Sequence, residues 1–114
     1  MADIIIHPLA SGFLDTLNIG LYLVPTAQRI QLSCFAIHNE SAVDVIVYAA
    51  ILVNGKTIKL TPGSGNFTLK AGYKAELIHE ENKFFIDQGT MILGYAGSTD
   101  KVSFIVDGKV ILAV

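Results

Sequence analysis

The C-terminal part of the chain carries the clearest pattern of apolar and polar positions. From Thr90 to Val114, the two kinds of side chain alternate with a period of two residues over much of the segment. Turn-forming residues interrupt the alternation at Gly97-Ser98-Thr99-Asp100 and again at Asp107-Gly108. Such alternation is typical of strands with one buried face, and short turns join consecutive antiparallel strands. This segment therefore predicts strands in succession and an all-β domain.

Strands are also predicted through the first half of the chain. Ile19–Pro25 is interpreted as a strand that ends at its proline, and Gln28–His38 as a longer one. Val43–Val53 is almost continuously apolar and rich in β-branched residues, which is typical of a central strand buried on both faces. Asn54-Gly55 follows at once and predicts a two-residue hairpin, because both central positions of a type I′ turn need a positive φ. Lys56–Leu60 is then the returning strand.

Shorter segments complete the predicted fold. Asn66–Leu69 predicts a short strand, and Lys74–Glu80 and Lys83–Ile86 predict two more on either side of a polar break at Glu80-Glu81-Asn82. A helix over Tyr73–Lys83 is the alternative for this region, since several of its residues favour helices. With roughly eight strands separated by frequent turns, we predict an antiparallel β-sandwich, jelly-roll-like, with a small closed β-barrel as the alternative.

The N-terminal residues 1–18 have no sustained period. They contain Pro8 and Gly12, which predict an arm or a short edge strand followed by a turn. We therefore divide the chain into an N-terminal arm, residues 1–18, and a β-sandwich domain, residues 19–114. An arm of this kind could reach a neighbouring molecule.

The composition predicts association. Of the 114 residues, 52% are hydrophobic and only 16% are charged, whereas a domain of this size buries roughly two-thirds of its extended-chain surface on folding. Interfaces between identical subunits are richer in apolar area than ordinary surface. We therefore expect part of the apolar excess to lie between copies of the chain in a homo-oligomer.

Charge and targeting signals exclude several classes of protein. The net charge is −2 and the lysines form no run, which argues against nucleic-acid binding, because affinity for phosphate needs clustered cations. The longest apolar stretch, Val45–Val53, is about half the ~20 residues that a membrane helix needs, and Ile4 to Ile6 follow Asp3 without a cationic leader. We expect synthesis in a cytoplasm and no membrane partner. The single cysteine, Cys34, is interpreted as a buried, inert thiol.

No catalytic or metal-binding pattern stands out in the sequence. His7, His38 and His79 lack the close spacing of metal ligands, and adjacent Glu80 and Glu81 would point to opposite faces of a strand. We predict no catalytic residues, no cofactor and no metal, and hence no enzyme. Two glycosylation sequons, at Asn39 and Asn66, are interpreted as coincidental. A sugar-binding groove is the remaining possibility for the four tyrosines, which are Tyr22, Tyr48, Tyr73 and Tyr95.

The order of several short motifs resembles a group of small structural proteins of tailed bacteriophages. A "Y-x-V-P" strand at Tyr22–Pro25 leads into a long strand that ends in "x-N-x-S" at Asn39 and Ser41. "L-x-A-G" follows at Leu69–Gly72, then "L-x-x-G-x-x-I-x-x-x-A", which corresponds to Ile86–Ala96, and finally "V-x-F-x-V-x-G" at Val102–Gly108. The resemblance covers about four-fifths of the chain and resides mostly in turn residues and alternating apolar positions.

This resemblance implies a virion structural protein, commonly a trimer of β-sandwiches. We expect a capsid decoration (cement) protein that oligomerises, binds the major capsid protein or another virion protein and stabilises the phage head; its localisation would be the virion, after synthesis in the host cytoplasm. The alternative is a tail or fibre accessory module that binds a receptor or a carbohydrate. The residues expected to contact the capsid lie in the arm and are Ile4, Ile5, Ile6, Phe13 and Leu14.

Overall fold

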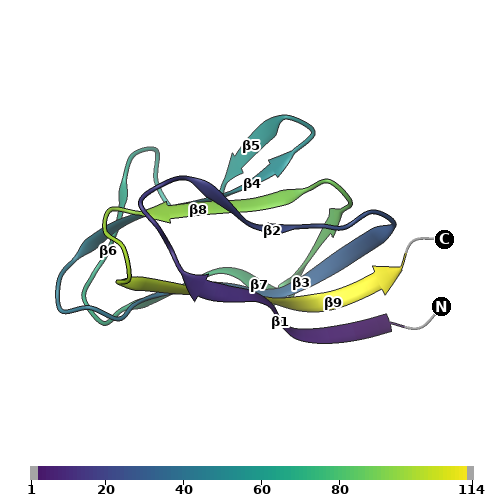
Figure 1. Ribbon diagram of the computed structural model, residues 1–114, viewed down its shortest axis with the longest axis horizontal. Helices are drawn as coiled ribbons and strands as arrows, with labels where there is room; N and C mark the ends of the chain where they lie inside the picture. The colour runs from purple at the N-terminus through teal and green to yellow at the C-terminus, as the bar shows by residue number, and fades with distance from the viewer. Residues whose placement is uncertain (1–2, 113–114) are drawn as a thin grey trace.

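The fold consists of two packed antiparallel sheets (Figure 1). A computed structural model describes residues 3–112, with the side chains of residues 3–8, 80–83 and 112 outside the description. Within residues 3–112 there are nine strands: β1 (Asp3–Phe13), β2 (Ile19–Leu23), β3 (Gln28–Asn39), β4 (Val45–Val53), β5 (Lys56–Lys59), β6 (Phe67–Leu69), β7 (Lys74–Asp87), β8 (Met91–Ala96) and β9 (Val102–Leu112).

The strand order is that of a jelly roll. One sheet has the order β1-β9-β3-β7, and the other has the order β2-β8-β4-β5, with β6 beside β4. The chain thus crosses between the two layers repeatedly, which Figure 1 shows as a lower and an upper layer. Over the described residues the sheets do not close into a barrel. The predicted all-β sandwich is confirmed, and the closed barrel is not formed.

The whole topology is one long hairpin that has been folded over itself. Its pairs are nested: β4 pairs with β5 and β6, β3 with β7, β2 with β8, and β1 with β9, all antiparallel. Residues at similar distances from the middle of the chain are therefore partners, as in Val45 with Leu69, Arg29 with Asp87 and Asp3 with Ile111. The turn at Asn54-Gly55 lies near the centre of this arrangement.

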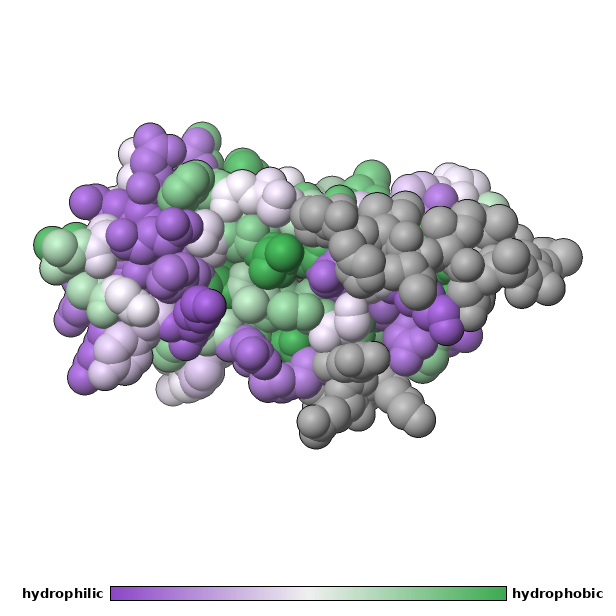
Figure 2. Space-filling model, turned by 90° about the horizontal axis from the view of Figure 1, so that it is seen from below, coloured by the Kyte–Doolittle hydropathy of each residue, from purple (hydrophilic) through white to green (hydrophobic). Residues whose placement is uncertain are grey.

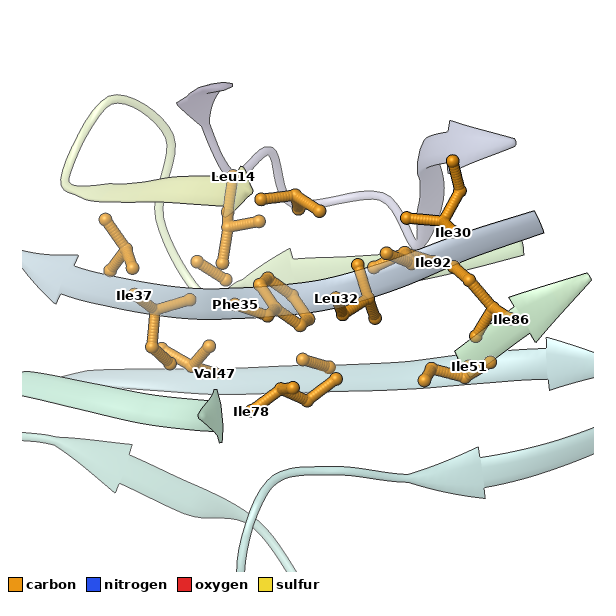
Figure 3. Packing of buried hydrophobic residues seen from close by; sticks show 14 of the residues in the cluster. Leu14, Ile30, Leu32, Phe35, Ile37, Val47, Ile51, Ile78, Ile86 and Ile92 are labelled. Carbon is orange, nitrogen blue, oxygen red and sulfur yellow. The ribbon is translucent and has the colours of Figure 1, made fainter. Parts of the chain in front are cut away.

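The core lies between the sheets and is made of the inward positions of each strand. Figure 3 shows the side chains of β3 pointing toward those of the opposite sheet, with Phe35 in the middle. β3 buries Ile30 and Leu32 and, after the extra residue between Leu32 and Cys34 has shifted the alternation, Phe35 and Ile37. Their partners from the second sheet include Val47, Ile51 and Ile92.

The predicted hairpin at Asn54-Gly55 is confirmed. Both residues have positive φ, 50° for Asn54 and 78° for Gly55, and Val53 pairs directly with Lys56 across them. Positive φ at both central positions defines a type I′ turn, whose twist matches that of the strands it joins.

The prediction of a turn at Asp107-Gly108 is wrong, because both residues lie inside the continuous strand β9. Gly108 is required there by close packing. A Cβ at this position would lie 2.8 Å from the backbone oxygen of Gln31 and 3.1 Å from Cγ2 of Ile30. The approach occurs where β3 carries an extra residue, since Leu32 pairs with Gly108 and Cys34 pairs with Asp107.

The region around residues 80–82 forms one long strand, β7, so the helical alternative over Tyr73–Lys83 is wrong. The predicted polar break survives as an interruption of the pairing. On β3, Leu32 pairs with Phe84 but Cys34 pairs with His79. Residues 80–83 are therefore accommodated as an irregularity within the strand rather than as a turn.

The segment predicted as an arm or an edge strand forms an edge strand over residues 3–13. Its pairing with β9 shifts register between Ile6 and Ala10, and Pro8 lies in that interval, as is usual for a proline in an edge strand. The backbone N–H of Leu14 then donates to the carbonyl oxygen of Val102 at 2.8 Å. Residues 3–14 thus pack with the rest of the sandwich.

Candidate functional site

The outer faces of the two sheets differ in chemistry. The β1-β9-β3-β7 sheet presents many charged and polar side chains outward, including the Arg29–Asp87 ion pair at 3.1 Å and the His79–Glu76 contact at 2.7 Å. Figure 2 shows this face, with hydrophobic residues gathered at its middle and hydrophilic residues around them. Ala36 and Ile105, which pair across β3 and β9, belong to the apolar middle.

The outer face of the β2-β8-β4 part of the other sheet is apolar throughout. Burial alternates along β4 and β8, and the registers of β4 with β8 and of β2 with β8 bring their outward positions side by side. We call this surface the apolar face, and its residues are Leu23, Ile46, Tyr48, Ala50, Leu52, Met91, Leu93 and Tyr95.

The side chains of the apolar face are closely packed against one another. Tyr48 and Tyr95 pair directly across the two strands, and their rings stack with centroids 5.2 Å apart and planes inclined by 23°. Met91 lies across the strand β2, where a Cβ on Gly20 would come within 2.7 Å of its sulfur. The absence of a side chain at Gly20 therefore lets the thioether lie flat on the sheet.

The two ends of this surface are open to solvent, whereas its middle is half-buried or, at Ala50, buried. Ile46 is 42% exposed and Leu23 is 53% exposed, at opposite ends of the face. The expectation that Val43–Val53 is buried on both faces is wrong for the outer face, because among the described residues no second layer covers it. The signal for this surface in the sequence is the run Val45–Val53 itself, because the residues that alternate with its core positions are also hydrophobic.

No charged side chain occupies the apolar face. The nearest outward charge on the neighbouring strand is Lys59, which pairs with Ala50. Its Nζ donates to the backbone oxygens of Gly63 at 2.7 Å and Gly65 at 2.6 Å, so this ammonium is held by its own loop. The face offers only the two tyrosine hydroxyls as polar groups.

The structure separates the residues predicted to contact a capsid. Ile4, Ile5 and Ile6 lie in β1, paired with β9, and their side chains are outside the described residues. Phe13 is 48% exposed at the end of that strand. Leu14 is only 1% exposed and is part of the core, so its side chain is not accessible to a partner in the folded chain.

The four tyrosines do not form one groove. Tyr48 and Tyr95 lie together, whereas Tyr22 packs against the core, where burial raises the pKa of its hydroxyl. Tyr73 is 62% exposed in the turn before β7. A sugar-binding site usually adds hydrogen-bonding side chains to its aromatic platform, and the neighbours of the Tyr48–Tyr95 pair are apolar.

One cluster of reactive residue types was not predicted. Cys34 pairs with His79 on one side and Asp107 on the other, and a carboxylate oxygen of Glu76 lies 2.7 Å from His79 Nδ1. Burial, followed by the negative charges of Glu76 and Asp107, raises the pKa of the Cys34 thiol. A nucleophilic cysteine needs a lowered pKa, so the cluster favours the protonated thiol.

Asn39 has a structural role that the sequence did not reveal. Its Nδ2 donates to the carbonyl oxygens of Val43 at 2.7 Å and Leu69 at 2.8 Å, and its Oδ1 accepts from the Ser41 hydroxyl at 2.7 Å. Because Leu69 belongs to the opposite sheet, this amide links the two layers. It is fully buried and is therefore not accessible as a glycosylation site.

Two hollows on the surface of the described part are small. One, of about 210 Å³, lies on the outer face beside Ala36, Ile105 and Lys74. Another, of about 240 Å³, lies between the β4–β5 turn and the end of β7. Sites for small molecules usually measure about 300–1,000 Å³. No group of three or more His, Cys, Asp or Glu side chains within the described ranges is arranged to hold a metal ion.

Fold and surface together define a jelly-roll β-sandwich with one apolar outer face. Comparison of the chain with protein-family models, curated proteins and solved structures finds no match. Over the part of the chain that the structure describes, no helix has the length and hydropathy needed to cross a membrane.

Proposed function

We propose that this chain is a non-enzymatic structural protein of a phage particle, of the capsid decoration type, that forms homo-oligomers and stabilises the head. The observation that supports it best is the apolar face. Monomeric proteins rarely expose contiguous apolar patches larger than a few hundred Å², and such patches mark contacts with other macromolecules. The phage assignment itself rests on the motif resemblance described above.

The two outer faces suit two different contacts. The apolar face suits association between copies of the chain. The opposite sheet carries Phe13 diagonally across from Ile105, since Ser11 pairs with Ile105 and Phe13 with Ser103, and polar residues surround this apolar middle (Figure 2). A small apolar centre with a polar rim is the usual anatomy of a contact between separately folded proteins. We assign it to the major capsid protein or another virion protein.

The mechanism of stabilisation would be mass action. A protein that binds only the mature shell lowers the free energy of that state by RT ln(1 + [L]/Kd) at each site, about 2.7 kcal/mol when its free concentration is 100 times Kd. Repeated over a shell, such increments oppose disassembly. No catalytic group is required for this function.

The copy number in purified particles tests the proposal. A denaturing gel of phage particles that contain this chain should show its band at an intensity comparable to that of the major capsid protein, because decoration follows the capsid lattice. Absence of the chain from particles would refute the virion assignment. A few copies per particle would contradict the decoration role and favour a tail or fibre protein.

The tail or fibre alternative is favoured by one observation, the stacked and partly exposed Tyr48–Tyr95 pair. Aromatic rings of this kind can stack against sugar rings. A glycan array probed with the wild-type protein tests this alternative. Binding that is lost in Tyr95→Ala would support it, and the absence of binding to any glycan would refute it.

A further inference from the structure

We infer that the apolar face packs against the same face of a second copy of this chain, forming a closed two-fold dimer with four layers of strands. This inference names the partner in the self-association that the proposed function includes. It concerns the isolated protein and requires no phage particle.

The chemistry of the apolar face selects a second copy as its occupant. A two-fold interface brings each residue against the same set of residues, so any charge at its centre would oppose itself. The eight residues of the face carry no charge. Association with nucleic acid would instead require cations on this surface, and the ammonium of nearby Lys59 is held by its own loop.

The composition of the rest of the surface argues for a symmetric contact. A head-to-tail contact needs a second, different apolar patch of matching size. The opposite outer face, in its described part, has an apolar middle bordered by the charged residues Lys74, Glu76 and Asp107. Covering the apolar face with it would transfer these charges from water to an apolar surface, which costs free energy. The apolar face itself is the better match.

The area of the face suits a small interface. Its strands β4, β8 and β2 have nine, six and five residues, and with a rise of about 3.3 Å per residue and about 4.8 Å between strands they cover a footprint on the order of 300 Å². Protruding side chains make the accessible area larger than this footprint. Standard interfaces bury about 800 Å² per partner and weak ones less than about 600 Å², so the dimer belongs to the weak class and is tested at high protein concentration.

The layered geometry of β-sandwiches also suits this packing. Face-to-face sheets in β-sandwiches lie about 10 Å apart with interdigitated side chains. In the dimer, Ala50 and Leu93 would lie at the middle of the face, the Tyr48–Tyr95 pair would lie between them and Ile46, and Leu23 would close the other end. Tyrosine is enriched among the residues that dominate interface energetics.

Analytical ultracentrifugation of the full-length chain tests the inference. At about 100 μM the wild-type protein should sediment as a dimer, twice the chain mass of 12.3 kDa. The double variant Leu23→Lys/Ile46→Lys places charges at two exposed ends of the face and should raise the dimer Kd at least about 100-fold, because like charges in an interface cost several kcal/mol.

Ile105→Lys provides the matched control. Ile105 is 39% exposed and Ile46 is 42% exposed, both are isoleucines on inner strands of their sheets, and they lie on opposite outer faces. Ile105→Lys should leave the dimer intact. A monomeric or trimeric wild-type protein, or equal dissociation by Ile105→Lys, would overturn the inference.

Nitration of tyrosine provides a second measurement that needs no variant. Tyr48 and Tyr95 should be modified several-fold more slowly at high than at low protein concentration, whereas the exposed Tyr73 should react at a constant rate. Equal concentration dependence at all three would overturn the inference. A dimer that is absent from phage particles would refute the virion assignment and leave this inference standing. A monomer abundant in particles would refute this inference, with the self-association on which it rests, and leave the virion assignment standing.

Discussion

Gly108 has no side chain because the backbone of β3 is too close. A Cβ there would lie 2.8 Å from the carbonyl oxygen of Gln31, a backbone atom that the paired strand cannot easily move. We predict that Gly108→Ala destabilises the fold by about 1–3 kcal/mol, the usual cost of overpacking an interior site. Urea unfolding of wild type and variant measures the difference.

Gly65→Ala is the control for this experiment. A Cβ at Gly65 meets no atom within 4 Å, and the residue has no positive φ in the structure. Its replacement should therefore change stability little, or raise it slightly by restricting the unfolded chain. Equal stability of Gly108→Ala and Gly65→Ala would contradict the prediction, because the backbone of β3 would then move away from the added Cβ without lowering the free energy of unfolding.

Cys34 provides a test at the level of ionisation. Burial, with the charges of Glu76 and Asp107, raises the pKa of its thiol in the folded state. The resulting stability is fully present below the pKa of the unfolded thiol, about 8.5, and is lost as the pH rises through the raised folded pKa. We predict that stability falls more steeply above this pH in the wild-type protein than in Cys34→Ser.

The urea midpoint of both proteins is measured between pH 7 and pH 10, at pH values about half a unit apart. Titration of tyrosines and lysines is common to both proteins and cancels in the comparison. Parallel pH profiles would contradict the assigned environment of the thiol.

At the level of elements, two adjacent residues at the end of β1 have different roles: one side chain packs in the core, and the other is exposed and available to a partner. Leu14 is in the core and Phe13 is half exposed. We predict that Leu14→Ala lowers the free energy of unfolding by about 2–5 kcal/mol, as for other buried leucines, whereas Phe13→Ala changes it by less than about 1 kcal/mol. Urea unfolding measures both.

This difference changes how the predicted arm can be tested. Removal of residues 1–14 would also remove the partner of β9 and a core side chain, so lost attachment to a particle would not identify a contact. Phe13→Ala leaves the fold intact and can be assayed for attachment directly. If Leu14→Ala were as stable as Phe13→Ala, the assignment of Leu14 to the core would be contradicted.

The strands that could be predicted from sequence are those whose signals are local. Asn54-Gly55 needs positive φ at both positions, and the apolar residues along Gln28–His38 indicate a strand. Which of them face the core was not predictable, because the extra residue between Leu32 and Cys34 shifts the buried set to Phe35 and Ile37. The errors arose where distant residues decide. Gly108 resembles a turn glycine until β3 is placed beside it, and the helix-favouring residues of β7 are held as a strand by pairing with β3.

At the level of the molecule, the sequence predicted two packed sheets and an apolar excess but not where that excess lies. Val45–Val53 has apolar residues at both alternating sets of positions, which indicates two buried faces. Whether the second face is covered by the same chain depends on the topology, and the nested hairpin places β4 and β8 with one face outward. The cluster around Cys34 was not predictable for the same reason, because its members come from three strands.

The proposed dimer predicts that thermal stability depends on concentration. Only folded chains pair, so a hundredfold rise in protein concentration stabilises the dimer by RT ln 100, about 2.7 kcal/mol, or about 1.4 kcal/mol per chain. For a domain of this size that corresponds to a rise in Tm of up to about 6 °C, reached in full only where the dimer is already formed at the lower concentration. Calorimetry or circular dichroism between about 1 and 100 μM should show this rise for wild type and Ile105→Lys, but not for Leu23→Lys/Ile46→Lys. A wild-type Tm that does not change with concentration would leave the apolar face without the partner assigned to it.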